Sequence, residues 1–253
     1  MIILKSEAEV EKIRVACQIV AETLEYLKEN IKPGMTTTDL DRMAEERILK
    51  KGGKPAFKGY RNFPATLCAS INSEVVHGIP SKKSVLNEGD IIGLDLGAIV
   101  DGFYGDAAIS VPVGEISTEA RNLIKTTEES LYKGIEQARM GNRLSDISHA
   151  VQVHVEAAGY SVVRDFVGHG IGRNLHEDPQ IPNYGEPGQG PVLKKGMVLA
   201  LEPMVNMGKN PVIILDDKWT VVTRDGSLSA HFEHTISITE NGPVILSSLK
   251  KDF

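Results

Sequence analysis

The sequence predicts an α+β domain in which one unit occurs twice and an antiparallel sheet is covered by helices. Two observations predict this class. Parts of the chain repeat at an offset of 107 residues, and in each copy two amphipathic helical patterns precede apolar runs typical of buried strands. We expect a single catalytic domain over residues 1–253, with repeats at about 6–110 and 117–246.

The repeat relates acidic residues in the two halves. Residues 86–95 match residues 193–202, so Asp95 and Glu202 occupy equivalent positions. Both acids stand in apolar runs that read as buried strands. A site with ligands from both copies would lie at the join between the halves, where clefts are usually found.

Each copy shows the same helix signals. A Ser or Thr precedes each apolar periodic pattern, and a glycine follows the second pattern, which are the usual signs of helix starts and ends. The expected N-caps are Ser6, Thr36, Ser117 and Ser145, and the expected terminal glycines are Gly52 and Gly159.

An Asp-Gly pair between two apolar runs predicts a β-hairpin in the first copy. With residues 101–102 as a two-residue loop, Val100 pairs with Phe103. Asp95 and Asp106 then become diagonal neighbours on one face of the sheet. A register one step tighter would place them directly opposite each other, and in either case the two acids converge.

Five side chains suited to binding metal lie in apolar or glycine-rich surroundings. They are Asp95, Asp106, His169, Glu202 and Glu233. An ionised carboxylate in a buried strand costs several kcal/mol unless it is paired or bound to a metal. The alternative is that each of these residues is a buried polar group whose hydrogen bonds are made within the protein. This is less plausible for all five together than for any one of them.

Four converging carboxylates repel one another, and two divalent ions would cancel that charge. Four acids with one imidazole and no thiolate suit cobalt, manganese, iron or zinc rather than a closed structural zinc site. With shared carboxylates the ions would be about 3.5–4 Å apart and could activate a bridging water. This pattern indicates a hydrolase.

Composition restricts the cellular setting and the partners. The net charge is −6 without a basic block, which argues against nucleic acid as the main ligand. The two cysteines form no disulfide framework, and no apolar run is long enough to cross a membrane. A short apolar start followed at once by charged residues does not resemble a secretory signal. We expect a cytoplasmic protein, monomeric by default.

Three segments carry a resemblance to a known family. They are residues 167–179 (VGHGIGRNLHEDP), 201–204 (LEPM) and 232–235 (FEHT). With the acids described above, they make the chain similar to methionine aminopeptidases of the pita-bread fold, over nearly its whole length. Only 31 positions separate Glu202 from Glu233, which leaves no room for the helical insertion of the type II enzymes, so the resemblance is to type I.

The resemblance implies a role for each ligand. Asp95 would chelate one ion, His169 and Glu202 would complete the other, and Asp106 and Glu233 would bridge both. Glu202 would also carry the proton of the attacking water.

Two further histidines and an apolar slot complete the implied site. His176 would polarise the scissile carbonyl, and His77 would contact the substrate near the scissile nitrogen. The positions that match the methionine slot are Phe57, Tyr60, Phe63, Cys68, Leu175 and Trp219. Phe57, Phe63 and Leu175 depart from the commonest bacterial residues but keep the slot apolar. His231, where relatives often carry glutamine, is expected beside the site.

The implied activity is removal of the N-terminal methionine from nascent chains and peptides with a small second residue. The resemblance also includes a monovalent cation near residues 70–73 and Ser229, and transient contact with the ribosome is compatible with it. Three alternatives stay open: a proline-directed peptidase of the same fold, a catalytically silent binding protein, and a structural domain that uses its acids in salt bridges. The last would need arginines nearby, and Arg173 is the only one adjacent to the motif.

Overall fold

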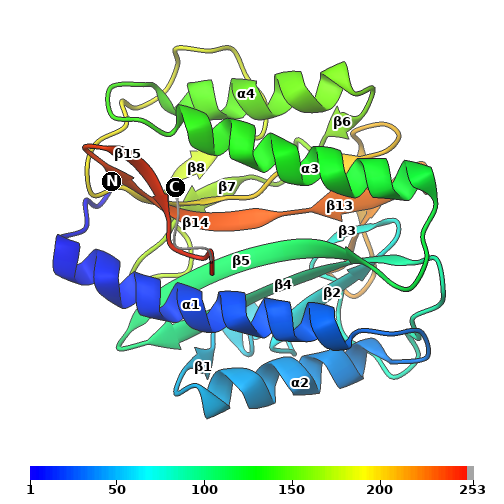
Figure 1. Ribbon diagram of the computed structural model, residues 1–253. Helices are drawn as coiled ribbons and strands as arrows, with labels where there is room; N and C mark the ends of the chain where they lie inside the picture. Colours follow the sequence, from blue (N-terminus) through cyan, green and yellow to red (C-terminus); the bar gives the residue numbers. More distant parts are fainter. Residues whose placement is uncertain (250–253) are drawn as a thin grey trace.

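Residues 1–249 are described by the computed structural model and contain one large antiparallel sheet, two small sheets and four α-helices (Figure 1). The helices are α1 (Glu7–Asn30), α2 (Thr37–Lys50), α3 (Thr118–Gln137) and α4 (Leu144–Ala157), with the short 3-10 helix η1 (Tyr60–Asn62). The strands are β1 (Lys54–Pro55), β2 (Leu67–Ile71), β3 (Glu74–Val76), β4 (Ile91–Val100), β5 (Phe103–Pro112), β6 (Ser161–Val162), β7 (Gly168–Gly170), β8 (Glu177–Ile181), β9 (Val198–Leu201), β10 (Met204–Asn206), β11 (Val212–Ile214), β12 (Val221–Thr223), β13 (Ser229–His231), β14 (Glu233–Thr239) and β15 (Gly242–Ile245).

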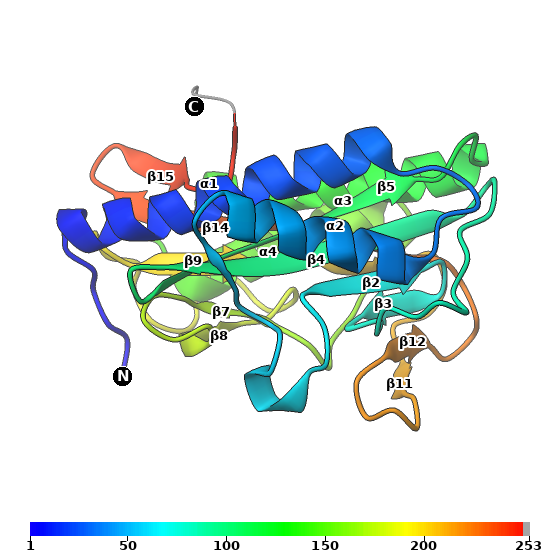
Figure 2. The same cartoon turned by 90° about the horizontal axis from the view of Figure 1, so that it is seen from below.

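The large sheet joins both parts of the chain. Its strand order is β1-β4-β5-β14-β9-β7-β8, with β2 also paired to β4 and β15 to β14. Helices α1, α2 and α3 lie on one side of this sheet, while η1 and the β11–β12 hairpin project from the other side (Figure 2). The helix side buries a core in which Leu24 and Leu27 of α1 pack with Leu94 of β4. The opposite side is therefore the one free to carry a site.

Three of the predicted helix starts are confirmed. The hydroxyl oxygens of Ser6, Thr36 and Ser117 each accept a hydrogen bond from the backbone N–H three residues later. Ser6 and Thr36 form full capping boxes, because the acid at the third position accepts from the backbone N–H of the cap residue in return. The two expected terminal glycines, Gly52 and Gly159, have positive φ angles of 83°, as helix-ending glycines do.

The fourth helix start is different from the prediction. Helix α4 begins at Leu144 with Arg143 as its N-cap, so Ser145 lies inside the first turn. The Asp146 carboxylate accepts from the Arg143 backbone N–H at 2.7 Å, which supplies the cap from the helix side. The Ser145 hydroxyl instead accepts from the Gln189 backbone N–H at 2.7 Å and ties down the loop before β9.

The two helix pairs make matching contacts 107 residues apart. The Gly34 N–H donates to the Leu86 carbonyl at 2.8 Å, and the Gly141 N–H donates to the Leu193 carbonyl at 3.1 Å. Isolated bridges also join residues 36 and 85 in one half and residues 143 and 192 in the other. These contacts support the duplicated unit, which stays a prediction.

Helix α1 crosses β5 in backbone contact at Gly105. A Cβ atom added to Gly105 would lie 2.7 Å from the carbonyl carbon of Ala16, closer than real Cβ atoms come to backbone. Because glycine has no side chain, the helix can pack closely against β5 at the residue directly before Asp106. The close approach of α1 thus supports the part of β5 that faces the site.

We predict that Gly105→Ala destabilises the protein by about 3 kcal/mol, because neither backbone can move away without losing its packing. Gly93→Ala in β4 is the matched control, since its added Cβ would lie 3.7 Å from the nearest atom, an ordinary contact. Urea denaturation of both variants measures the difference. Equal midpoints for the two variants would contradict the close approach.

Candidate metal centre and substrate pocket

Five neighbouring strands of the large sheet each bring one of the predicted ligands to the same place. Asp95 lies in β4, Asp106 in β5, Glu233 begins β14, Glu202 directly follows β9, and His169 is the middle residue of β7. These strands are consecutive in the sheet. Glu202 was expected within a strand, but β9 ends at Leu201 and the acid stands just past its end.

The strand register places the acids on one face. The predicted hairpin is confirmed, because Val100 pairs with Phe103. Asp95 and Glu233 are both paired with Ala108, one from each side of β5. Asp106 precedes Ala108 by two residues and so projects from the same face, diagonal to Asp95.

The cluster is buried and several of its oxygens have no partner. Asp106 and Glu233 are 4% and 3% exposed. Within residues 1–249, one carboxylate oxygen each of Asp95, Asp106 and Glu233 accepts no hydrogen bond. Ligand atoms of Asp106, His169 and Glu233 all lie within 4.8 Å of one another. Buried acceptors without donors are costly, and a bound cation would satisfy them.

Burial also changes the acidity of the four carboxyl groups. It raises the pKa of Asp95, Asp106, Glu202 and Glu233, and the negative charges of neighbouring acids in the cluster raise the pKa of the last three further. The protein alone therefore disfavours the fully ionised cluster. A divalent cation would reverse this preference, because it favours the charged form of each ligand.

His169 presents one ring nitrogen to the cluster. Its Nδ1 is 2.9 Å from the Gly170 carbonyl oxygen, and since a carbonyl only accepts, Nδ1 carries the proton and donates. The lone pair of Nε2 then faces the Glu202 and Asp106 carboxylates, at 3.6 and 4.0 Å. Burial lowers the pKa of His169 to about 3, so the ring is neutral at pH 7, as a metal ligand must be.

The salt-bridge alternative does not fit this geometry. Among residues 1–249, the side chains within ion-pair distance of these acids are His169 and His231, and no arginine or lysine pairs with them. Arg173 pairs instead with Glu9 at the surface, at 3.5 Å.

The five predicted ligands line a pocket with a volume of about 130 Å³. Every residue predicted to touch substrate lines it: Phe57, Tyr60, Phe63, Cys68, His77, Leu175, His176 and Trp219. The pocket wall also includes Arg61, which the sequence analysis missed. Its neighbours in the chain, Tyr60 and Phe63, were the available signal.

Aromatic contacts hold the two pocket histidines. The His176 ring stacks on Tyr60 at 5.4 Å, and its Nδ1 is 2.9 Å from the Tyr60 hydroxyl. The His77 ring packs edge-on against Trp219 and Phe166 at 6.0 and 5.7 Å. His77 has a φ of 60°, a left-handed conformation that is rare outside glycine and often found at functional sites.

His231 lies beside the cluster, as expected. Its ring is 3% exposed, and its Nε2 is 3.9 Å from Glu202 without a hydrogen bond. Burial lowers its pKa to about 3.

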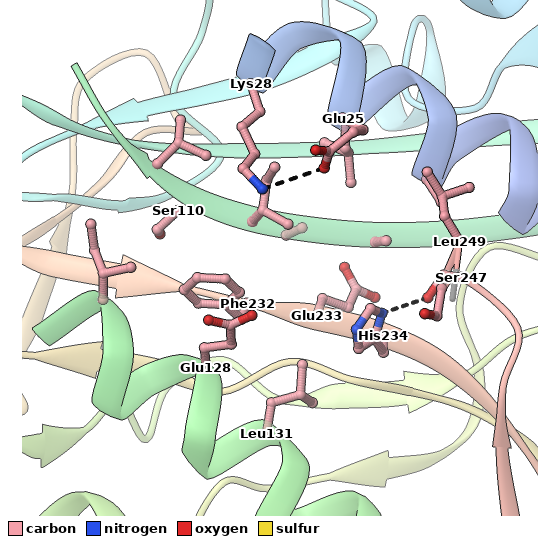
Figure 3. A pocket seen from close by; sticks show the side chains of 18 of the residues that line it. Glu25, Lys28, Ser110, Glu128, Leu131, Phe232, Glu233, His234, Ser247 and Leu249 are labelled. Atoms are coloured by element: carbon pink, nitrogen blue, oxygen red, sulfur yellow. Dashed lines mark hydrogen bonds and ion pairs between the residues drawn. The ribbon is translucent and has the colours of Figure 1, made fainter. Parts of the chain in front are cut away.

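Strand alternation separates the site from the helix side of the sheet. Glu233 faces the cluster, while the next residue, His234, bonds to the Ser247 hydroxyl at 2.8 Å on the other face (Figure 3). A second cavity of about 370 Å³ lies on that face between α1 and α3. Of the five predicted ligands, Glu233 alone lines this cavity, whereas all five line the smaller pocket.

Comparison with known proteins identifies the class. Residues 11–240 match the model of metallopeptidase family M24, and the chain belongs to this family. Within this family, two sequence relatives place the chain among the methionine aminopeptidases. It is 59% identical to a methionine aminopeptidase of Clostridium acetobutylicum over 98% of this chain and 99% of that protein. It is 56% identical to methionine aminopeptidase 1 of Bacillus subtilis, over 98% and 99% of the two chains.

Solved structures of related enzymes agree with the sequence relatives and confirm the pita-bread fold. A methionine aminopeptidase from Thermotoga maritima superposes with a TM-score of 0.97 at 50% identity, covering 98% of this chain and all of that one. A prolidase from Pyrococcus furiosus superposes with a TM-score of 0.76 at 26% identity, covering 98% of this chain and 66% of the prolidase. No helix within residues 1–249 is both long and apolar enough to span a membrane.

We predict that Glu233→Gln has opposite effects on metal binding and on the metal-free fold. Removing one of four buried like charges should stabilise the metal-free protein at pH 8 by on the order of 2 kcal/mol. The same change should lower the metal retained after dialysis, because a ligand charge is lost. Thermal unfolding in chelator and elemental analysis measure the two effects.

The control is Glu186→Gln, which neutralises an exposed acid and should change stability by less than about 0.5 kcal/mol. Undiminished metal content in Glu233→Gln would remove Glu233 from the ligand set.

Proposed function

We propose that the chain removes the N-terminal methionine from nascent proteins and peptides whose second residue is small. The observation that carries the proposal is the convergence of five metal-binding side chains from five neighbouring strands at the floor of an apolar pocket. Membership in a metallopeptidase family and relatives named methionine aminopeptidase support the reaction and the substrate.

The donor set fits two divalent ions. Four carboxylates and one neutral imidazole match cobalt, manganese, iron or zinc, and the unpartnered oxygens of Asp95, Asp106 and Glu233 are the atoms that such ions would satisfy. Asp95 would hold one ion, His169 and Glu202 the other, with Asp106 and Glu233 shared. Divalent ions there would supply a ligand position for the free α-amine, positive charge near the carbonyl oxygen and a water acidic enough to attack at neutral pH.

Glu202 is suited to move the proton. It stands just past the end of β9 rather than within a paired strand, and its side chain is 15% exposed, more than that of Asp106 or His169. It can take a proton from the attacking water and deliver it to the nitrogen of the leaving amine.

His176 is suited to steady the carbonyl oxygen. When the Tyr60 hydroxyl donates to Nδ1, 2.9 Å away, the ring proton resides on Nε2 and is available to the oxyanion that forms. Burial, with a smaller contribution from Arg61, lowers the pKa of His176, so the ring acts as a neutral donor. His77, which packs against Trp219 in the pocket wall, would contact the substrate near the scissile nitrogen.

The apolar wall accounts for the choice of methionine. An unbranched thioether side chain fits a narrow slot, and sulfur makes favourable contacts with aromatic ring edges. Phe63 and Trp219 pack edge to face at 5.1 Å, and Cys68 is buried beside Asp95 through the pairing of β2 with β4. These residues, with Phe57, Tyr60 and Leu175, form the proposed slot.

The cellular setting completes the proposal. The enzyme would act in the cytoplasm as a monomer on emerging chains, with transient contact to the ribosome. A monovalent cation near residues 70–73 and Ser229 stays a prediction.

We predict that the protein releases methionine from Met-Gly-Met-Met much faster than from Met-Leu-Met-Met when cobalt or manganese is present. The proposed preference for a small second residue implies a subsite too small for a branched side chain. Free methionine is measured by chromatography, with a chelator as control. Cleavage of X-Pro peptides instead would indicate a prolidase-like enzyme, and no cleavage of any peptide by the folded, metal-loaded protein would indicate a silent binding protein.

We predict that Glu202→Gln retains the fold but lowers kcat by at least about 100-fold, because the amide cannot accept the proton. Steady-state kinetics and circular dichroism test this prediction. The matched control is Glu186→Gln, at the surface, which should retain full turnover. A Glu202→Gln enzyme with unchanged kcat would assign the proton transfer to another group.

A further inference from the structure

A buried ion pair joins the start of the chain to Glu177, the first residue of β8. Lys5 is 8% exposed, and its Nζ lies 2.6 Å from the Glu177 carboxylate. Only 4% and 5% of the two side chains are exposed, whereas most ion pairs between lysine or arginine and acids in the described part of the chain lie at the surface.

The remaining hydrogen-bonding groups of this pair are also used. Lys5 Nζ donates to the Ile3 carbonyl at 3.0 Å, and the other Glu177 oxygen accepts from the Asn174 N–H at 3.1 Å. A buried ion pair is stable only with such additional hydrogen bonds. The pair therefore holds residues 3, 174 and 177 in one arrangement.

The backbone of the N-terminal segment is fastened at the same point. The Lys5 N–H donates to the Gly196 carbonyl at 2.7 Å. A Cβ added to Gly172 would lie 2.6 Å from Lys5 Cε, so the lysine stem passes directly against the loop between β7 and β8. The lysine side chain therefore packs directly against that loop.

Glu177 directly follows His176, and the two side chains have different partners. His176 lines the pocket, stacks on Tyr60 and lies 4.3 Å from the His169 ring, centroid to centroid. Glu177 opens strand β8 and binds Lys5 away from the pocket. Movement of Glu177 would therefore be transmitted directly to His176.

We propose that the Lys5–Glu177 ion pair positions His176 for its contact with the carbonyl oxygen. This rests on the proposed function for its kinetic consequence. Lys5 and Glu177 are positioning residues, since neither lines the pocket. Lys5 lies 171 residues from His176 in sequence, so the segment that precedes α1 becomes part of the support of the site.

The first test compares Lys5→Met in two backgrounds. In the otherwise unchanged enzyme we expect kcat to fall about 10- to 100-fold, the effect of misplacing a catalytic group by about 1 Å, with KM for Met-Gly-Met-Met changed less than about threefold. In the His176→Ala background the same substitution should lower kcat by less than about twofold further, because the group it positions is gone.

The matched control is Lys195→Met. Lys195 lies near the same segment but pairs with Glu7 and Glu240 at the surface, at 3.3 and 3.1 Å, and its removal should leave kcat within about twofold. Equal losses for Lys5→Met in both backgrounds would overturn the proposal, since they would indicate a general structural effect. If Lys5→Met does not fold, the Lys5→Met/Glu177→Gln double variant, which leaves no lone buried charge, is compared in the same two backgrounds.

The second test does not require activity. The ring nitrogen chemical shifts of His176, measured by NMR on the folded protein, should change in Lys5→Met and stay the same in Lys195→Met. Unchanged shifts in Lys5→Met would overturn the proposal. If the shifts change in Lys5→Met but the unsubstituted protein itself releases no methionine, the positioning role is upheld and the proposed function is refuted.

Discussion

The burial of four carboxylates side by side is the constraint on which the rest of this structure depends. Asp95, Asp106 and Glu233 share one face of adjacent strands because both partner strands of β5 pair with the same residue, Ala108. Their mutual repulsion and their unpartnered oxygens make the protein alone a poor environment for this charge. The donor set explains why the fold should bind divalent ions and why His169 must be neutral.

The site combines two kinds of support. Four of the predicted ligands lie in strands of one sheet and Glu202 directly follows another, so the ladder sets their spacing, and α1 supports β5 by backbone contact at Gly105. The other residues that line the pocket come largely from loops, which need other means of support. Tyr60 holds His176 by stacking and a hydrogen bond, and the buried Lys5 pairs with the acid that follows it. Under the proposed function, the sheet would thus position the metal ligands, and specific side-chain contacts would position the residues that recognise the substrate.

The sequence analysis was wrong about the N-cap of α4 and missed Arg61 in the pocket wall. Ser145 resembled an N-cap, but Asp146 caps α4 from within the helix and frees the serine hydroxyl for the loop at Gln189. Arg61 reaches the pocket from η1 and has a φ of 47°, a conformation that periodicity does not reveal. Neither feature follows from apolar periodicity, because each depends on the backbone conformation of the folded chain.

The sequence by itself determined the class of fold and the position of the hairpin, and it predicted the set of ligands, because an acid in an apolar run and an Asp-Gly turn are local signals with strong physical costs. The family motifs then indicated the reaction. Only the tertiary structure decided the register of the hairpin, the tautomer of His169, the position of Glu202 just past the end of β9 and the pairing of Lys5 with Glu177. These depend on which distant backbone groups meet, and the packing of the whole sheet sets those distances.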